Sequence, residues 1–186
     1  MGRVSQAQAQ ENRRRVVETA SRLFREQGTH VSVADLMKEA GLTHGGFYKQ
    51  FASKEALIDE ATAHAFAELT RRRTTGLERH AGQRGSARRA LIEAYLSVEH
   101  RDDLADGCPA AALATDMARG LSAQEAGRVY SEGVADFADS LSTEDEDGLT
   151  RLCTMVGALV LSRATKGSPL SEEILSAARA ALTEAD

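Results

Sequence analysis

Residues 31–57 have the sequence VSVADLMKEAGLTHGGFYKQFASKEAL, and the pattern within this stretch decides the fold. Ser32 followed three residues later by Asp35 is typical of a capping box, which predicts that a helix starts directly after Ser32. Apolar side chains then recur at helical spacing over residues 33–40. Gly41 follows, and glycine commonly ends a helix because it tolerates the left-handed conformation required there. The stretch therefore predicts a short helix at residues 33–40.

A second short helix is expected directly after this one, from His44 to Phe51. Gly41, Leu42 and Thr43 would form the turn, and Thr43 is a suitable cap for the second helix. Two short helices joined by a glycine-containing turn form a helix-turn-helix, whose second helix enters the major groove of DNA. An ordinary helical hairpin has the same spacing, so spacing alone leaves both alternatives open.

The rest of the chain also has helical periodicity, and no stretch alternates apolar and polar residues as a strand does. The fold class is therefore all-α, with about nine helices. Besides the two short helices, seven are expected at residues 10–27, 54–73, 86–99, 109–119, 123–141, 147–163 and 171–185. Residues 76–85 and 143–147 are polar and are predicted to be loops.

Composition limits the class of protein. The length of 186 residues and a hydrophobic share of 42% allow a buried core without disulfides or metals. Cys108 and Cys153 are far apart and lack zinc-site spacing, so no metal or other cofactor is expected. The sequence has neither the apolar run of a signal peptide nor an apolar run of about 18 residues. These features predict a cytoplasmic protein without membrane contact.

Charge is distributed unevenly along the chain, whose formal net charge is -5. Residues 1–54 contain nine Lys and Arg against five Asp and Glu, whereas residues 55–186 contain fourteen against twenty-three. A basic N-terminal part on an acidic body is expected when only one end of the molecule binds DNA. Chance is the alternative explanation of this asymmetry.

Several positions together resemble the DNA-binding signature of the TetR family of bacterial regulators. The matching residues are Ala40-Gly41-Leu42, Phe47-Tyr48, Phe51 and Ser53-Lys54-Glu55-Ala56-Leu57. The resemblance covers about residues 13–57 and is specific, because many positions agree at once. It implies a non-enzymatic repressor that binds a palindromic double-stranded DNA operator as a homodimer and is released by a small hydrophobic effector. The implied domains are a DNA-binding domain at residues 1–54 and a ligand-binding and dimerisation domain at residues 55–186.

The resemblance also implies roles for single residues in the DNA-binding domain. Phe47 and Phe51 would be core residues. The Tyr48 hydroxyl would donate to a phosphate, and Thr43 would cap the recognition helix and offer another phosphate contact. Lys54 would pair with a phosphate at a helix N-terminus, where the helix dipole also favours an anion. Such contacts position a protein on DNA but carry little sequence information.

Base reading would then depend on His44, Gly45, Gly46 and Lys49, with Tyr48 as a further candidate. Two glycines inside a helix destabilise it by about 0.8–1.0 kcal/mol each relative to alanine. Close approach of the backbone to the groove is one reason for them, and a weak helix start tolerated by packing is the other. His44 and Lys49 are the best candidates for sequence specificity, although His44 could also be a solvent-exposed histidine without a role.

Basic residues at the N-terminus have two interpretations. Arg3, Arg13, Arg14 and Arg15 precede or open the first helix. A basic arm can contact phosphates or the minor groove of DNA. A solvated helix face is the equally supported alternative.

For the C-terminal part, the resemblance implies an internal ligand cavity and a dimer formed by the last two helices, at residues 147–163 and 171–185. Small residues would let these helices pack closely: Gly157, Ala158, Ala177, Ala178 and Ala181. Packing within one chain is the alternative. The candidate effector-binding residues are Phe66, Tyr95, Cys108, Leu113, Met117, Tyr130, Phe137 and Met155. Each of them could instead be an ordinary core residue.

Cys108 has a second possible role. It stands directly before Pro109, which suits the first position of a helix, so Cys108 would be the N-cap. The helix dipole would lower the pKa of a thiol there, which allows a redox- or electrophile-sensing regulator as the alternative function. A small residue at a tight turn is the simpler explanation. Cys153 lies on an apolar stripe and is expected to be inert packing.

Overall fold

The computed structural model describes residues 6–120, 124–143 and 147–184. These residues form ten α-helices and one 3₁₀ helix and no strand, which confirms the all-α class and slightly exceeds the expected number of helices. The helices are α1 (Gln6–Gln27), α2 (Val33–Glu39), η1 (His44–Lys49), α3 (Lys54–Arg79), α4 (Arg84–Tyr95), α5 (Val98–Asp102), α6 (Pro109–Ala112), α7 (Ala114–Ala118), α8 (Gln124–Leu141), α9 (Gly148–Ala164) and α10 (Leu170–Glu184). None of these helices is both long and apolar enough to cross a membrane.

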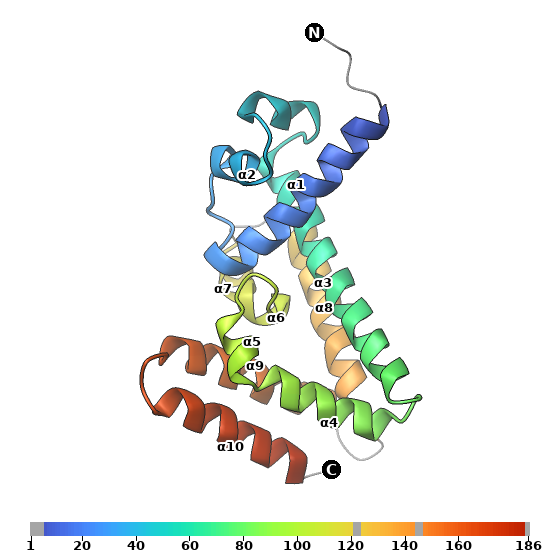
Figure 1. Cartoon of the computed structure of the whole chain (residues 1–186), viewed down its shortest axis with the longest axis vertical. Helices are drawn as coiled ribbons and strands as arrows, with labels where there is room; N and C mark the ends of the chain where they lie inside the picture. Colours follow the sequence, from blue (N-terminus) through green and yellow to red (C-terminus); the bar gives the residue numbers. More distant parts are fainter. Residues whose placement is uncertain (1–5, 121–123, 144–146, 185–186) are drawn as a thin grey trace.

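The helices build an elongated molecule (Figure 1). α1, α2 and η1 lie at one end, and the hairpin of α9 and α10 lies at the other. α3 and α8 pack side by side and connect the two ends, and α3 also packs along α1. α3 therefore extends from α1 toward the other end of the molecule, where it contacts α4.

The predicted loop at residues 76–85 is wrong in its first half, because α3 continues through Gly76 to Arg79. One glycine inside a helix costs only about 1 kcal/mol, and the packing of α3 on α8 offsets that loss. The turn is confined to residues 80–83, where Ala81 and Gly82 have positive φ angles of 52° and 75°.

Two helices that were predicted as single elements are each divided in two. The predicted helix at residues 86–99 begins earlier, at Arg84, and breaks after Tyr95. It breaks there because the Ser97 hydroxyl accepts a hydrogen bond from the His100 amide and starts α5. The predicted helix at residues 109–119 is divided into α6 and α7 at Leu113, whose side chain is buried.

The interior consists of two clusters of buried apolar side chains. The N-terminal cluster contains Val16, Ala20, Phe24, Val31, Leu36, Met37, Ala40, Phe47, Phe51, Leu57, Ile58, Ala61, Leu113 and Ala126. The C-terminal cluster contains Phe66, Ile92, Tyr95, Leu96, Cys108, Ala110, Ala111, Phe137, Ala138, Leu141, Leu152, Met155, Ala158, Leu159, Leu175 and Leu182. α3 contributes to both clusters. Leu113 and Ala126 come from the body of the chain, yet they complete the N-terminal cluster.

The start of α9 packs tightly against the end of α8 at Gly148. A Cβ atom on Gly148 would overlap the backbone carbonyl oxygen of Ala138. Gly148→Ala is therefore expected to lower the free energy of unfolding by about 2 kcal/mol, as overpacking does.

The matched control is Gly127→Ala in α8, because a Cβ on Gly127 meets nothing within 4 Å. This change should raise stability by up to about 1 kcal/mol, the helix-propensity difference between the two residues. Urea unfolding of both variants measures the effects. Equal stabilities of the two variants would contradict the tight contact at Gly148.

Candidate nucleic-acid interface

The turn between α2 and η1 has the geometry that the sequence predicts. The Ser32 hydroxyl accepts a hydrogen bond from the Asp35 amide at 3.1 Å and caps α2. Gly41 has a φ of 68°, a left-handed conformation in which a side chain would be strained. The Leu42 amide donates to the Met37 carbonyl at 2.8 Å, which closes the C-terminus of α2. η1 then packs directly on α2.

The second helix of the motif differs from the prediction in type and length. Residues 44–49 form a 3₁₀ helix, whereas an α-helix was expected from His44 to Phe51. Thr43 is at the N-cap position, but its side chain makes no capping hydrogen bond, so that expected bond is wrong. Gly45 and Gly46 account for the shorter 3₁₀ helix. Glycine disfavours a regular α-helix, and 3₁₀ geometry is common in short segments.

Phe47 fixes η1 to the protein body. Its side chain is fully buried, and its ring is stacked with that of Phe51 at a centroid distance of 5.4 Å. Both residues belong to the N-terminal cluster, in agreement with their expected core role. With Phe47 directed inward, the next residue is directed outward.

Tyr48 is the most prominent side chain on the outer surface of η1. It is 66% exposed, and its ring meets Phe47 edge-on at 5.1 Å and His44 edge-on at 6.3 Å. His44, Gly45 and Lys49 are also exposed, whereas Gly46 is half-buried and faces Met37. The surface of η1 thus offers a phenol, an imidazole and an ammonium group, with bare backbone between them.

Lys54 begins α3 beside this surface. The Ser53 hydroxyl caps α3 by accepting from the Ala56 amide at 3.2 Å. Lys54 is half-buried, and this burial lowers the pKa of its ammonium group, while Glu55 and Asp116 oppose the change. A positively charged side chain at a helix N-terminus is a suitable contact for a phosphate.

The structure assigns different roles to the basic residues near the N-terminus. Arg3 lies outside the described residues. Arg13 forms an ion pair with Glu60, with one bond of 2.6 Å, and its guanidinium lies 4.5 Å from the centre of the Phe51 ring. Arg14 pairs with Glu11 on its own helix. Arg13 therefore joins α1 to α3, which neither interpretation predicted, whereas the exposed Arg14 agrees with either of them.

A cavity of about 220 Å³ lies between the two ends of the molecule. It is lined by Arg25, Leu69, Arg72, Arg73, Leu91, Ala94, Tyr95, His100, Asp106, Gly107, Cys108 and Pro109. Two of the eight candidate effector-binding residues, Tyr95 and Cys108, are among them. Phe66, Tyr130, Phe137 and Met155 instead lie within or against the C-terminal cluster. Leu113 and Met117 belong to the N-terminal cluster, away from this cavity.

The two cysteines differ from expectation. Cys108 is the N-cap of α6, but burial raises the pKa of its thiol, so the predicted lowering by the helix dipole is wrong. Desolvation disfavours the thiolate more than one short helix stabilises it. Cys153 is exposed, so its predicted role in packing within the chain is also wrong.

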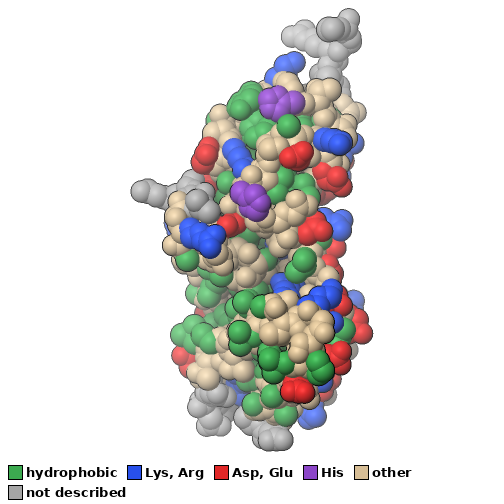
Figure 2. Space-filling view, turned by 90° about the vertical axis from the view of Figure 1, so that its left-hand side faces the viewer, with side chains coloured by type: hydrophobic (Ala, Val, Ile, Leu, Met, Phe, Trp, Pro, Cys, Tyr) green, Lys and Arg blue, Asp and Glu red, His purple; other side chains and the backbone are tan. Residues whose placement is uncertain are grey.

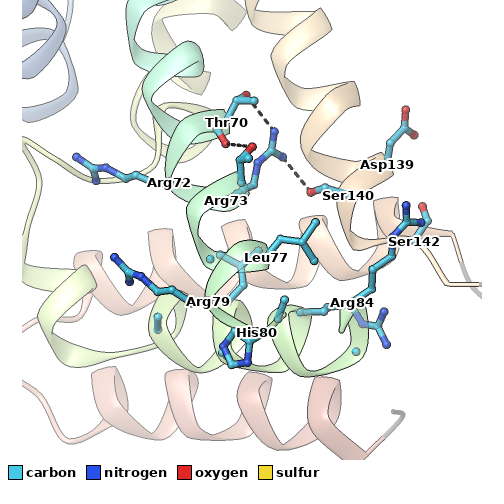
Figure 3. Close-up of a pocket in the computed structure, with 18 of the residues that line it drawn as sticks. Thr70, Arg72, Arg73, Leu77, Arg79, His80, Arg84, Asp139, Ser140 and Ser142 are labelled. Atoms are coloured by element: carbon cyan, nitrogen blue, oxygen red, sulfur yellow. Dashed lines mark hydrogen bonds between the residues drawn. The ribbon is translucent and has the colours of Figure 1, made fainter. Parts of the chain in front are cut away.

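A second, larger groove of about 1300 Å³ lies between the end of α3, α4 and the end of α8. Several arginines line it, but they do not converge on one point (Figure 3). Arg72 and Arg79 extend to one side, Arg84 extends to the other, and Arg73 bonds to Ser140 at 2.9 Å. The groove therefore has a basic lining without a focused anion site.

Comparison with known proteins supports the interpretation of the helix-turn-helix. Residues 16–61 match the family model described as bacterial regulatory proteins of the tetR family. This part of the chain therefore resembles the DNA-binding region of that family. One relative, the HTH-type transcriptional regulator AcrR of Shigella flexneri, is 38% identical over 61 residues. That match covers 32% of this chain and 28% of the relative, so the similarity between the two sequences is confined to a part of each.

Solved structures show that the TetR-type fold extends over the whole chain. The reduced form of NemR from E. coli has a TM-score of 0.77 at 19% identity, covering 94% of this chain and 96% of NemR. A TetR transcriptional regulator from Chloroflexus aurantiacus has a TM-score of 0.72 at 21% identity, with coverages of 96% and 95%. A TetR-family regulator from Agrobacterium tumefaciens has a TM-score of 0.75 at 17% identity, with coverages of 95% and 98%. At these identities, the likeness concerns the fold.

Several residues of the cavity were not predicted from the sequence. Arg25, Leu69, Arg73 and His100 all line it. Helical periodicity identified the buried face of α3, but it cannot separate side chains that fill the interior from those that border a void. Arg25 was the one available signal. It is a basic residue within the apolar face of α1, and a buried arginine requires partners nearby.

Proposed function

We propose that this protein is a ligand-responsive, DNA-binding regulator of transcription of the TetR family. In this proposal it is a cytoplasmic homodimer that binds a palindromic operator and is released by a small hydrophobic molecule. The main support for this proposal is the outer surface of η1. Tyr48 and its neighbours are exposed there, while Phe47 anchors η1 in the core. Exposure of a large aromatic side chain next to basic groups suits contact with a DNA backbone.

Dimerisation is supported by an apolar stripe on α9. Leu149, Cys153, Val160 and Leu161 are exposed and recur at helical spacing, with Gly157 open between them. Leu170, at the start of α10, is also exposed. Figure 2 shows apolar side chains gathered on the lower part of the molecule, where α9 and α10 lie. A second copy of the chain would bury this stripe and hold two η1 elements about 34–36 Å apart, one turn of DNA.

The alternative function, a sensor that reacts through Cys108, gains no support from the geometry. The thiol is buried and its pKa is raised, whereas reactive cysteines are partly exposed and have lowered pKa values. A small molecule bound without a covalent bond is therefore the preferred effector.

Lys54→Ala tests the DNA-binding surface. Loss of one phosphate contact should weaken binding to all DNA sequences alike and reduce the slope of log K against log salt concentration by about 0.9. Tyr48→Phe should also weaken binding to all sequences. Fluorescence anisotropy with DNA from upstream of the gene, or with fragments selected from the genome, measures both effects at several salt concentrations.

The control is Lys166→Ala, because Lys166 pairs with Asp102 at 3.1 Å at the opposite end of the molecule. It removes the same charge but should leave the slope unchanged. A slope that stays the same in Lys54→Ala would exclude its phosphate contact, and the absence of selective DNA binding in the unaltered protein would contradict the proposed function.

A further inference from the structure

The hydroxyl group of Tyr95 is buried without a hydrogen-bond partner. Tyr95 is 4% exposed, and its oxygen has no partner among the described residues. Tyr130, by contrast, donates to the Ala110 carbonyl at 2.6 Å. Buried polar groups in proteins are nearly always hydrogen-bonded, so an unpaired hydroxyl requires an explanation. Cys108 is its polar neighbour, but a thiol is a weak hydrogen-bond group.

Tyr95, which carries this hydroxyl, is one of the residues that line the 220 Å³ cavity. Tyr95 and Cys108 both line the cavity, and the thiol acts directly on the phenol by raising its pKa. Much of the remaining wall is apolar, from Leu69, Leu91, Ala94 and Pro109. The volume is below the about 300–1,000 Å³ of sites for drug-sized ligands. The cavity therefore suits a small, largely apolar molecule.

Three titratable groups at the cavity are neutral, those of Tyr95, His100 and Cys108. Burial raises the pKa of Tyr95 well above its ordinary value and also raises that of Cys108, so both keep their protons. Burial lowers the pKa of His100, whose Nδ1 lies 2.7 Å from the Tyr95 carbonyl. Because that carbonyl can only accept, Nδ1 carries the proton of the neutral ring. A protonated tyrosine whose only neighbouring acceptor is the weak thiol sulfur of Cys108 is available as a donor to a ligand.

The charged groups at the cavity are already engaged. Arg25 pairs with Glu68 at 3.1 Å, and Arg72 pairs with the same carboxylate at 2.9 Å. Asp106 lies within 4.0 Å of both guanidinium groups. The guanidinium of Arg73 is directed to oxygens of α8 and lies over a ring of that helix. A charged ligand would therefore have to break existing pairs.

We propose that this cavity binds a small, uncharged, largely apolar molecule carrying one hydrogen-bond acceptor, and that Tyr95 donates to that acceptor. The inference rests on the proposed function, since this molecule would be the effector. Arg25 links the cavity to the DNA-binding end, because it comes from α1 and donates to the Gly107 carbonyl at 3.1 Å. A molecule in the cavity would lie beside the hydrogen bond between Arg25 and Gly107, because both residues line the cavity. It would thereby favour a position of α1 that differs from the position in the empty protein.

Three single-ring compounds of similar size serve as probes. Acetophenone has a carbonyl acceptor, and isopropylbenzene has a similar size without an acceptor. Benzoate is charged. Calorimetry and thermal shift on the full chain measure binding. Acetophenone should bind about tenfold more tightly than isopropylbenzene, the equivalent of one hydrogen bond, and more tightly than benzoate. Equal binding of the first two, or no binding of acetophenone at millimolar concentration, would overturn the proposal.

Tyr95→Phe removes the unpaired hydroxyl. The melting temperature without ligand should stay the same or rise, because only a weak interaction with the Cys108 thiol is lost, while the preference for acetophenone should disappear. Tyr130→Phe is the matched control: it breaks a bond that exists, so it should lower the melting temperature and keep the preference. A structural role of the Tyr95 hydroxyl would give the reverse pattern, a lower melting temperature with unchanged preference.

DNA binding is measured separately, with and without acetophenone. Release of DNA by acetophenone in the unaltered protein, but not in Tyr95→Phe at the same concentration, supports the effector role. Acetophenone binding without any effect on bound DNA would overturn that role. Ligand binding in a protein that binds no DNA would contradict the proposed function and leave the chemistry of the cavity in place.

Discussion

Leu161→Glu is expected to convert the protein from a dimer to a monomer and to weaken binding to a palindromic operator by about 10²–10⁴-fold. Leu161 is 57% exposed on the apolar stripe of α9. In a symmetric dimer each substitution occurs twice, so two carboxylates would be buried in an apolar interface. The loss of DNA affinity follows, because each half-site would then be bound independently. Light scattering and fluorescence anisotropy measure the two effects.

Leu104→Glu is the matched control. Leu104 is 38% exposed but lies between α5 and α6, away from the α9 stripe. The same substitution there should leave both the dimer and the DNA affinity unchanged. If Leu161→Glu remained a dimer while circular dichroism showed an intact fold, the α9 stripe would not be the interface.

Arg25→Ala should lower the free energy of unfolding by about 3 kcal/mol, the low end for removing one member of a buried ion pair. The Arg25 side chain is 2% exposed and bonds to Glu68, to the Gly107 carbonyl and to the Ser21 carbonyl. Its removal takes a buried donor away from the Gly107 carbonyl and one of two donors away from Glu68. Glu68 keeps Arg72 as a partner, which limits the loss. Chemical denaturation at neutral pH measures it.

Arg22→Ala is the control for this change. Arg22 lies on the same helix and faces Asp106 at 3.3 Å, but its side chain is 59% exposed. Exposed ion pairs contribute little, so the loss should be below about 1 kcal/mol. Similar losses in Arg22→Ala and Arg25→Ala would show that burial of Arg25 does not determine its contribution.

The pH dependence gives a second test of the Arg25 network. Burial alone would raise the pKa of Glu68, but Arg72 and Arg25 outweigh it and hold this pKa below its ordinary value of 4.5. A lowered pKa in the folded state contributes stability above pH 4.5, and that stability is lost as the pH falls further. The stability difference between the unaltered protein and Arg25→Ala should therefore narrow as the pH falls below 4.5.

The helix-turn-helix could be predicted from the sequence because several local signals coincide within it. Ser32 caps α2 and Gly41 ends it, as their residue types indicate. The 3₁₀ form of η1 could not be predicted from the sequence. Two successive glycines are compatible with several helical forms, and the burial of Phe47 decides which of them is adopted. Local signals fix where an element lies, and packing decides its exact form.

The cavity shows where sequence reasoning ends. Arg25 meets Glu68 and Gly107 across separations of 43 and 82 residues, and no local pattern encodes such contacts. Cys108 illustrates the same limit. Its position before Pro109 correctly predicts an N-cap, but says nothing about how deeply the thiol is buried. Its burial, which reverses the expected pKa change, comes from helices distant in the sequence.

The N-terminal cluster also restricts how this protein can be redesigned. Leu113 and Ala126 complete the hydrophobic interior around α1, α2 and η1, and the Asp116 carboxylate accepts from the Thr29 amide at 2.6 Å. A chimera that joined residues 1–54 to the body of another regulator would lack these partners and expose apolar surface. If η1 reads DNA as proposed, specificity is therefore better transferred by exchanging the outer side chains of η1 than by exchanging the whole N-terminal segment.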